Sequence, residues 1–104
     1  MIRNAFVMKL KPGCEAEYKK RHDQIWPEVA HELSAAGIAD YSIFLDLRTN
    51  YLFAVQKLAD NHSVSRLPDA AIMKKWWNHM RDIMDSNPDN SPAVRPLREM
   101  YHLD

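Results

Sequence analysis

The sequence predicts an α+β fold in which one antiparallel sheet carries two helices on a single face. Four segments alternate apolar and polar residues, as strands with one buried face do, and two other segments repeat apolar residues at helical spacing. The chain has 104 residues and is 46% hydrophobic, which suits one domain. We therefore expect a single domain over residues 1–104.

The first strand and the first helix are predicted in the first third of the chain. Residues 2–10 alternate well enough for a strand, which Pro12 and Gly13 then break. A helix is predicted over residues 15–36 from an apolar stripe made of Tyr18, His22, Ile25, Val29 and Leu33. Pro27 removes a backbone donor inside this pattern, so we expect the helix to be kinked or locally remodelled near Asp23.

A hairpin follows the first helix. Residues 38–47 and 51–58 both alternate, and the short polar gap between them indicates a turn. The polar segment 60–69 is expected to be a connection with a short helical turn.

A second helix and a last strand complete the predicted elements. The helix is expected over residues 69–84, with Pro68 at its first turn and a stripe made of Ile72, Met73, Trp76, Trp77, Met80, Ile83 and Met84. Residues 85–96 are too rich in Pro, Asn and Asp for regular structure, and residues 97–103 alternate again. The resulting order, βαββαβ, is ferredoxin-like and leaves one apolar sheet face uncovered, so we expect a homodimer.

Composition and cysteine content narrow the function classes. Fourteen basic residues balance fourteen acidic ones, which favours neither nucleic acid nor an anionic membrane surface as a partner. No apolar run approaches the ~20 residues that span a bilayer, and no signal peptide is apparent. The single cysteine, Cys14, cannot form an internal disulfide and fits a reducing compartment, so we expect a cytoplasmic protein.

Familiar cofactor and nucleophile motifs are missing from the sequence. The five histidines form no pair at helical ligand spacing, and Ala35 stands where the second histidine of a zincin motif begun by His31 would be. Two glycines cannot supply a dinucleotide-binding or phosphate-binding loop, and no serine lies in a nucleophile elbow. We therefore expect no metal and no cofactor.

Aromatic and histidine side chains supply the candidate site. Tyr18, His22 and Trp26 are spaced by four, so a helix would place Tyr18 and His22 on one face. The imidazole can move protons near neutral pH. Neighbouring Trp76 and Trp77 diverge by ~100° on a helix, so one would pack in the core while the other could form an apolar wall for a ring. Such a pocket suits a small polyhydroxylated ligand or an aromatic substrate, and these residues alone do not separate the two.

Several motifs together resemble the L-rhamnose mutarotase family over essentially the whole chain. They are Tyr18, RHDQIWPE at 21–28, YSIFLD at 41–46, MKKWW at 73–77 and EMYHLD at 99–104. The resemblance implies a cytoplasmic enzyme with the dimeric α/β-barrel fold, which interconverts the α and β anomers of L-rhamnopyranose. By matching position, His22 resembles the proton donor of the family, and Tyr18, Tyr41, Trp76 and Trp77 resemble its sugar-binding residues.

The chemistry of anomer exchange agrees with these residue types. Ring opening removes a proton from the anomeric hydroxyl and delivers one to the ring oxygen, which needs acid–base groups but no electron transfer. The base stays open among a water, a carboxylate and a neutral imidazole. Two alternatives also remain at this point. One is a cofactor-free or haem-degrading monooxygenase of the same barrel type, in which His22 would ligate iron or orient an electron-rich aromatic substrate. The other is a non-catalytic ligand-binding or stress-response dimer.

Overall fold

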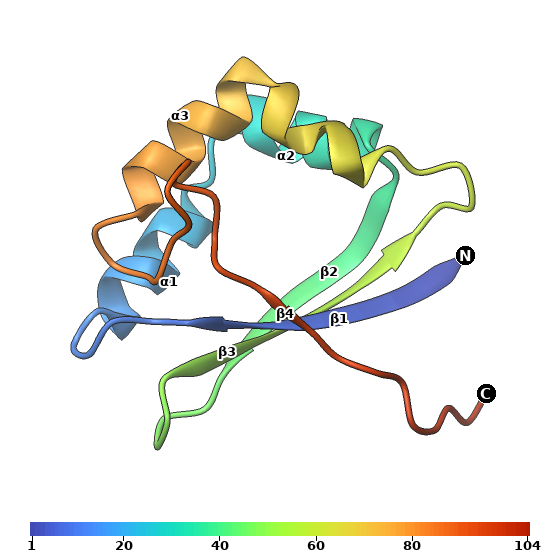
Figure 1. The fold of residues 1–104 in the computed structure, drawn as a ribbon, viewed down its shortest axis with the longest axis horizontal. Helices are drawn as coiled ribbons and strands as arrows, with labels where there is room; N and C mark the ends of the chain where they lie inside the picture. The colour runs from blue at the N-terminus through green and yellow to red at the C-terminus, as the bar shows by residue number, and fades with distance from the viewer.

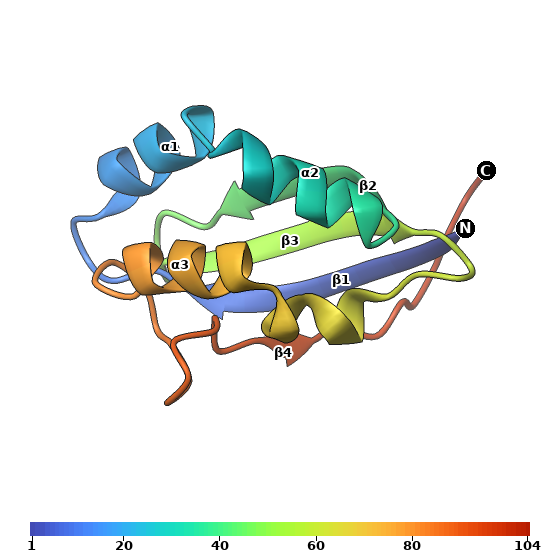
Figure 2. The same cartoon turned by 90° about the horizontal axis from the view of Figure 1, so that it is seen from above.

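An antiparallel sheet of four strands is covered on one face by the helices (Figures 1 and 2). The computed structural model describes residues 1–104. Its strands are β1 (Ile2–Lys9), β2 (Ile38–Leu45), β3 (Tyr51–Leu58) and β4 (Arg95–Pro96). Its helices are α1 (Glu15–Asp23), α2 (Pro27–Ala35), α3 (Ala71–Met80) and the 3₁₀ helix η1 (Val64–Asp69). The strand order β2-β3-β1-β4 confirms the ferredoxin-like prediction.

The alternation in β3 builds the main core. Leu52, Ala54, Gln56 and Leu58 are buried under the helices, while the residues between them face the other side of the sheet. From the helix layer, Met73, Trp76 and Met80 of α3 pack into the same core. The predicted bounds of this strand are confirmed, because a strand at the centre of a sheet has to satisfy a strict period of two. None of the helices combines the length and the apolarity needed to cross a membrane.

The prediction of one continuous helix over residues 15–36 is wrong, because the chain forms two separate helices there, although the change near Asp23 is where it was expected. Pro27 has no amide hydrogen to donate and disfavours a helical conformation in the residue before it. Trp26 accordingly has an extended backbone with ψ of 132°, and Pro27 occupies the first turn of α2. The break therefore lies over residues 24–26, directly before the proline.

The last helix and the last strand also differ from the prediction. Pro68 lies within η1, and α3 begins only at Ala71 because Ala70 is extended. The closing strand is Arg95–Pro96, inside the segment predicted to be a loop. After Leu97 donates a backbone hydrogen bond to Ala5, the chain leaves the sheet edge and residues 98–104 form no strand. An alternating sequence becomes a strand only where a partner edge accepts its hydrogen bonds.

Arg21 joins the first helix to the last. Its guanidinium pairs with Glu17 one turn earlier on α1 and with Asp82, and it donates to the backbone carbonyl of His79 at the end of α3. Only 13% of this side chain is exposed. The neighbouring pair, Lys19 with Asp23, remains in solvent, with 75% of the lysine side chain exposed.

We predict that Arg21→Met lowers the free energy of unfolding by about 1–2 kcal/mol, because the substitution leaves several charge-assisted hydrogen bonds unmade. The matched control is Lys19→Met, which removes an exposed pair on the same helix and should cost less than ~0.5 kcal/mol. Urea denaturation of both variants checks this. Equal losses for the two would mean that Arg21 does not join α1 to α3.

Candidate active site

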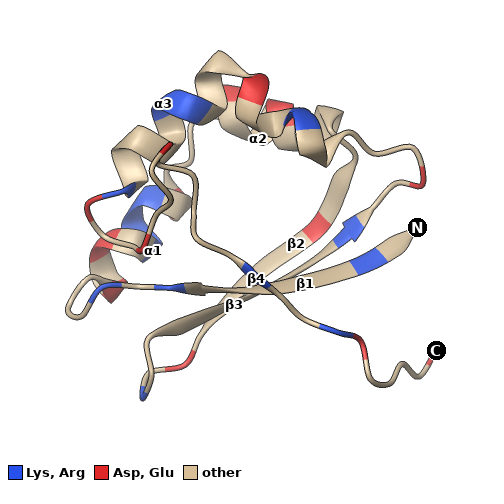
Figure 3. Cartoon of the chain, viewed as in Figure 1, with Lys and Arg blue, Asp and Glu red and all other residues tan.

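A cavity of about 960 Å³ lies between the helices and the inner face of the sheet. Its walls come from β1, β2, β3 and all three α-helices. Thirty residues line it, twenty of them hydrophobic, and the charged ones are Glu15, Lys19 and Asp23, all on α1. Figure 3 shows the charged residues spread over the helices, the loops and the strand ends. A largely apolar lining that carries only these three charges, two negative and one positive, suits a neutral ligand.

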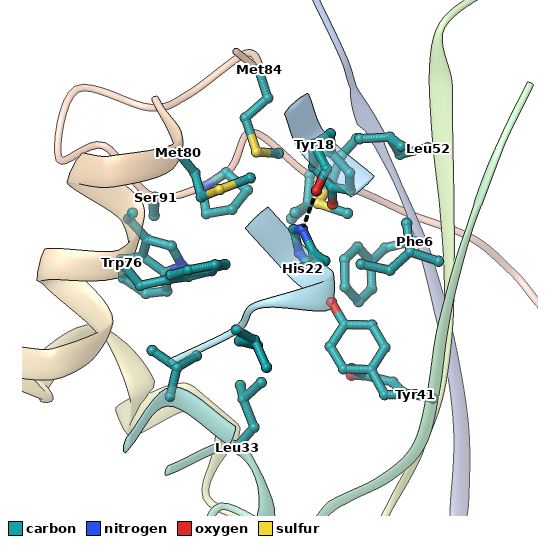
Figure 4. Close-up of a pocket in the computed structure, with 18 of the residues that line it drawn as sticks. Phe6, Tyr18, His22, Leu33, Tyr41, Leu52, Trp76, Met80, Met84 and Ser91 are labelled. Carbon is teal, nitrogen blue, oxygen red and sulfur yellow. Dashed lines mark hydrogen bonds between the residues drawn. The ribbon is translucent and has the colours of Figure 1, made fainter. Parts of the chain in front are cut away.

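His22 sits at the side of this cavity with a defined tautomer. It is stacked on Tyr18 one turn earlier, with ring centroids 4.2 Å apart. Its Nδ1 lies 3.1 Å from the backbone carbonyl oxygen of Tyr18 (Figure 4). A carbonyl can only accept, so Nδ1 carries the hydrogen and the lone pair of the neutral ring is on Nε2.

Burial controls the charge of His22. Loss of solvent lowers the pKa of the imidazole below its ordinary value of 6.5, and this outweighs the opposing effects of the Tyr18 carbonyl and of Asp23. The side chain is therefore mostly neutral at pH 7. A neutral ring with a free Nε2 is a proton acceptor in its resting state.

A β-bulge places Tyr41 in the cavity. Ala39 pairs with Lys57 and Ser42 pairs with Val55, so β2 has one residue more than β3 between these pairs. Asp40 absorbs the bulge with a positive φ of 48°. In a regular strand two residues three positions apart face opposite sides, but here both Ile38 and Tyr41 line the cavity.

The hydroxyl of Tyr41 points into the cavity, although 37% of the residue's surface is exposed (Figure 4). Burial of the phenol raises the pKa of Tyr41 to about 12. Burial also raises the pKa of Tyr18, and the nearby Tyr41 adds to that rise. Both phenols stay protonated at neutral pH, so they can donate hydrogen bonds but do not supply a base.

The two adjacent tryptophans both line the cavity, but to different depths. Trp76 is only 6% exposed, and its ring meets His22 nearly edge-on, with centroids 5.5 Å apart. Trp77 is partly buried on the neighbouring part of the wall. All five candidate residues from the sequence thus line one cavity: Tyr18, His22, Tyr41, Trp76 and Trp77.

Trp26 does not lie on the helix face that its spacing from Tyr18 and His22 predicts. It lies in the break between α1 and α2 and is not part of the cavity wall. Its indole meets Trp76 edge-on at 5.2 Å and stacks on His79 at 5.2 Å, so it supports Trp76 from outside the cavity. Packing against Trp26 restricts the side-chain rotamers of Trp76 and so fixes the orientation of its ring.

Several lining residues carry no functional signal in the sequence. Phe6 of β1 lies with its ring centroid 6.4 Å from that of Tyr41. Gln56 and Asn4 are hydrogen bonded to each other on neighbouring strands. The one available signal was Gln56 itself, a polar residue at a position where the period of β3 requires a buried side chain. The structure contains no group of three or more His, Cys, Asp or Glu residues placed to hold a metal ion.

A family model described as L-rhamnose mutarotase matches residues 3–103. The chain belongs to the L-rhamnose mutarotase family. An L-rhamnose mutarotase from Flavobacterium johnsoniae is 60% identical to it over 103 residues, covering 99% of this chain and 96% of that protein. Another from Rhizobium leguminosarum bv. trifolii is 52% identical, covering 97% and 95%.

The solved structures agree with this mutarotase family. The crystal structure of an L-rhamnose mutarotase from Formosa agariphila superposes with a TM-score of 0.92 at 47% identity, and all of both chains is covered. A putative antibiotic biosynthesis monooxygenase from Bordetella bronchiseptica also superposes, with a TM-score of 0.61 at 18% identity over 95% and 96% of the chains. The second likeness concerns the fold alone, so the monooxygenase alternative is not favoured.

We predict that Trp26→Leu changes the surroundings of Trp76 and leaves those of Trp77 unchanged, because the ring of Trp26 packs against Trp76 and forms no ring contact with Trp77. Fluorine NMR of protein labelled with 5-fluorotryptophan gives one signal for each of the three tryptophans. The Trp76 signal should shift and broaden, and stability should fall by about 1–3 kcal/mol. Trp26→Phe, which keeps an aromatic ring, is the control. An unshifted Trp76 signal in the leucine variant would contradict the supporting role.

Proposed function

We propose that this isomerase interconverts the α and β anomers of L-rhamnose, in L-rhamnose metabolism, with His22 as its catalytic acid–base group. The observation that carries the proposal for His22 is its neutral imidazole, with Nδ1 held by a backbone carbonyl and Nε2 free beside the apolar cavity. Anomer exchange consists of proton transfers around one carbon, so this group and a shaped cavity supply what the reaction needs.

The proposed first step opens the ring. Nε2 of His22 takes the proton of the anomeric hydroxyl, and the imidazolium formed gives that proton to the ring oxygen as the bond between C1 and the ring oxygen breaks. Both oxygen atoms are bonded to C1, so one nitrogen can serve them with a small movement. His22 is then the base in the first half of the step and the proton donor in the second.

The second half reverses these transfers on the other face of the carbonyl. The open aldehyde turns about the C1–C2 bond, and the hydroxyl on C5, which held the ring oxygen, attacks the opposite face of C1. His22 again receives a proton, from this hydroxyl, and returns it to the aldehyde oxygen. The hydroxyls of Tyr18 and Tyr41 stay protonated and hold the sugar oxygens by donating hydrogen bonds. We assign Trp76 and Trp77 the apolar side of the sugar, including its methyl group.

We predict that His22→Gln slows anomer exchange by about 10²-fold or more, because it removes the only group proposed to move protons. Magnetisation transfer between the rhamnose anomers measures the rate after the uncatalysed rate is subtracted. His31→Gln, a substitution of an exposed histidine on α2, is the control and should be neutral.

The pH profile tests the same assignment. A base works in its neutral form, so the rate should rise with pH through the pKa of His22 and then stay level. Because burial lowers that pKa, the midpoint of the rise should lie below 6.5. A folded His22→Gln protein with the native rate, or a midpoint above 6.5, would show that the mechanism is wrong.

We also propose a homodimer formed through the sheet face opposite the helices. Phe44 of β2 is 62% exposed there and pairs with Phe53 of β3, beside the exposed Val55. An uncovered apolar face of this kind favours association of two copies. A cytoplasmic location is proposed from the single cysteine and would be checked by fractionation against cytoplasmic marker enzymes.

We predict that Phe44→Glu converts the dimer into a monomer, because it places a charge in the proposed interface. Sedimentation of the native chain should give twice its 12.2 kDa. Leu47→Glu, which changes an exposed residue in the turn after β2, should sediment like the native protein. A native chain that sediments as a monomer at micromolar concentration rules out the proposed interface.

A further inference from the structure

Gln56 is a polar side chain in an otherwise apolar core. It is 5% exposed, while every other buried residue is hydrophobic. Its side-chain oxygen accepts a hydrogen bond of 2.9 Å from the amide nitrogen of Asn4, the residue opposite it on β1. Both side chains lie on the face of the sheet that the helices cover, and both line the cavity. A buried amide usually has a specific partner for each of its polar groups.

The hydrogen bond between the two amides leaves half of their capacity unused. No protein group accepts a hydrogen bond from the amide nitrogen of Gln56, and none donates one to the side-chain oxygen of Asn4. Yet no side-chain polar atom of the protein is both sealed from solvent and unpaired. The free donor and the free acceptor are therefore open to the cavity. This pair leaves the N–H donors of Gln56 and the side-chain oxygen of Asn4 available to a ligand.

The position of this pair relative to His22 can be followed along the strands. Asn4 is one inward position along β1 from Phe6, whose ring lies beside that of Tyr41. Gln56 lies on β3 between the residues that pair with the two ends of the bulge, opposite the segment that carries Tyr41. Tyr18 and Tyr41 line the same cavity, and Tyr18 stacks on His22. The amide pair thus lies beside Tyr41, in the row of inward-facing residues next to that of Phe6.

A pyranose ring has a matching arrangement. Its anomeric carbon and ring oxygen are neighbours, and C3 and C4 are the ring atoms across from them. When the first two atoms are held at His22, the hydroxyls on C3 and C4 point to the opposite side of the ring. A hydroxyl both accepts and donates a hydrogen bond, so it can satisfy an N–H and a C=O at once.

We propose that Gln56 and Asn4 form a hydroxyl-binding subsite that contacts the sugar at C3 or C4. The proposal rests on the proposed function, since it takes the reacting end of the sugar to lie at His22. The subsite distinguishes sugars by what they lack, because a ligand without that hydroxyl leaves a desolvated amide without a partner.

The test compares L-rhamnose with 3-deoxy- and 4-deoxy-L-rhamnose by equilibrium titration. The native protein should bind L-rhamnose about 5- to 10-fold more tightly than one of the two deoxy sugars, which is the loss expected for one hydrogen bond. Gln56→Met, similar in shape and without the amide, should weaken binding of L-rhamnose by the same factor and bind that deoxy sugar as the native protein does. Gln24→Met, an exposed substitution outside the cavity, should change nothing.

Two results would overturn the subsite: equal weakening of all three sugars by Gln56→Met, or no weakening of any. If Gln56→Met does not fold, Asn4→Leu is subjected to the same comparison. Failure of the proposed function would look different, because binding is measured without turnover. Sugar binding that depends on Gln56 in a protein that does not accelerate anomer exchange would reject the function and leave the subsite in place.

Discussion

The absence of one amide hydrogen, at Pro27, determines how the helix layer is built. Because the proline cannot continue the preceding helix, α1 stops at Asp23 and α2 starts again at Pro27, so each helix takes its own path across the sheet. His22 comes to lie at the end of α1 facing the cavity, and the extended Trp26 turns against Trp76. Each helix has only nine residues, too few for independent stability, so contacts such as those of Arg21 with the end of α3 are needed to hold them.

The partner of His22 explains its resting charge. A carboxylate hydrogen bonded to Nδ1 would stabilise the imidazolium, whereas the Tyr18 carbonyl fixes the tautomer with much less effect on the charge. Burial then prevails and the ring stays neutral. Burial acts in the opposite sense on Tyr18 and Tyr41, whose charged forms are anions, and it keeps their protons on. One apolar environment thus prepares an acceptor and two donors.

What could be foreseen from the sequence follows from the range of each interaction. The spacing of Tyr18 and His22 and the alternation of β3 are local patterns, and the structure contains both as expected. The bulge at Asp40 appears only when β2 is aligned with β3, and the hydrogen bond between Asn4 and Gln56 joins positions 52 residues apart. The last strand is predicted over residues 97–103 but lies at Arg95–Pro96 for the same reason. The edge of β1 pairs with Arg95 and Pro96, and the alternating residues that follow find no partner strand.

The largely apolar lining of the cavity has a consequence for how a neutral ligand arrives. Lys19 and Asp23 pair with one another, Glu15 is the only other charged residue of the lining, and most of the remaining wall is apolar. A neutral sugar feels no long-range field from such a cavity, so mobile ions have nothing to screen. Capture then depends on diffusion and on the geometry of the opening, and it proceeds at the same rate in dilute buffer and at physiological salt. The enzyme gives up electrostatic guidance and in exchange becomes insensitive to the ionic composition around it.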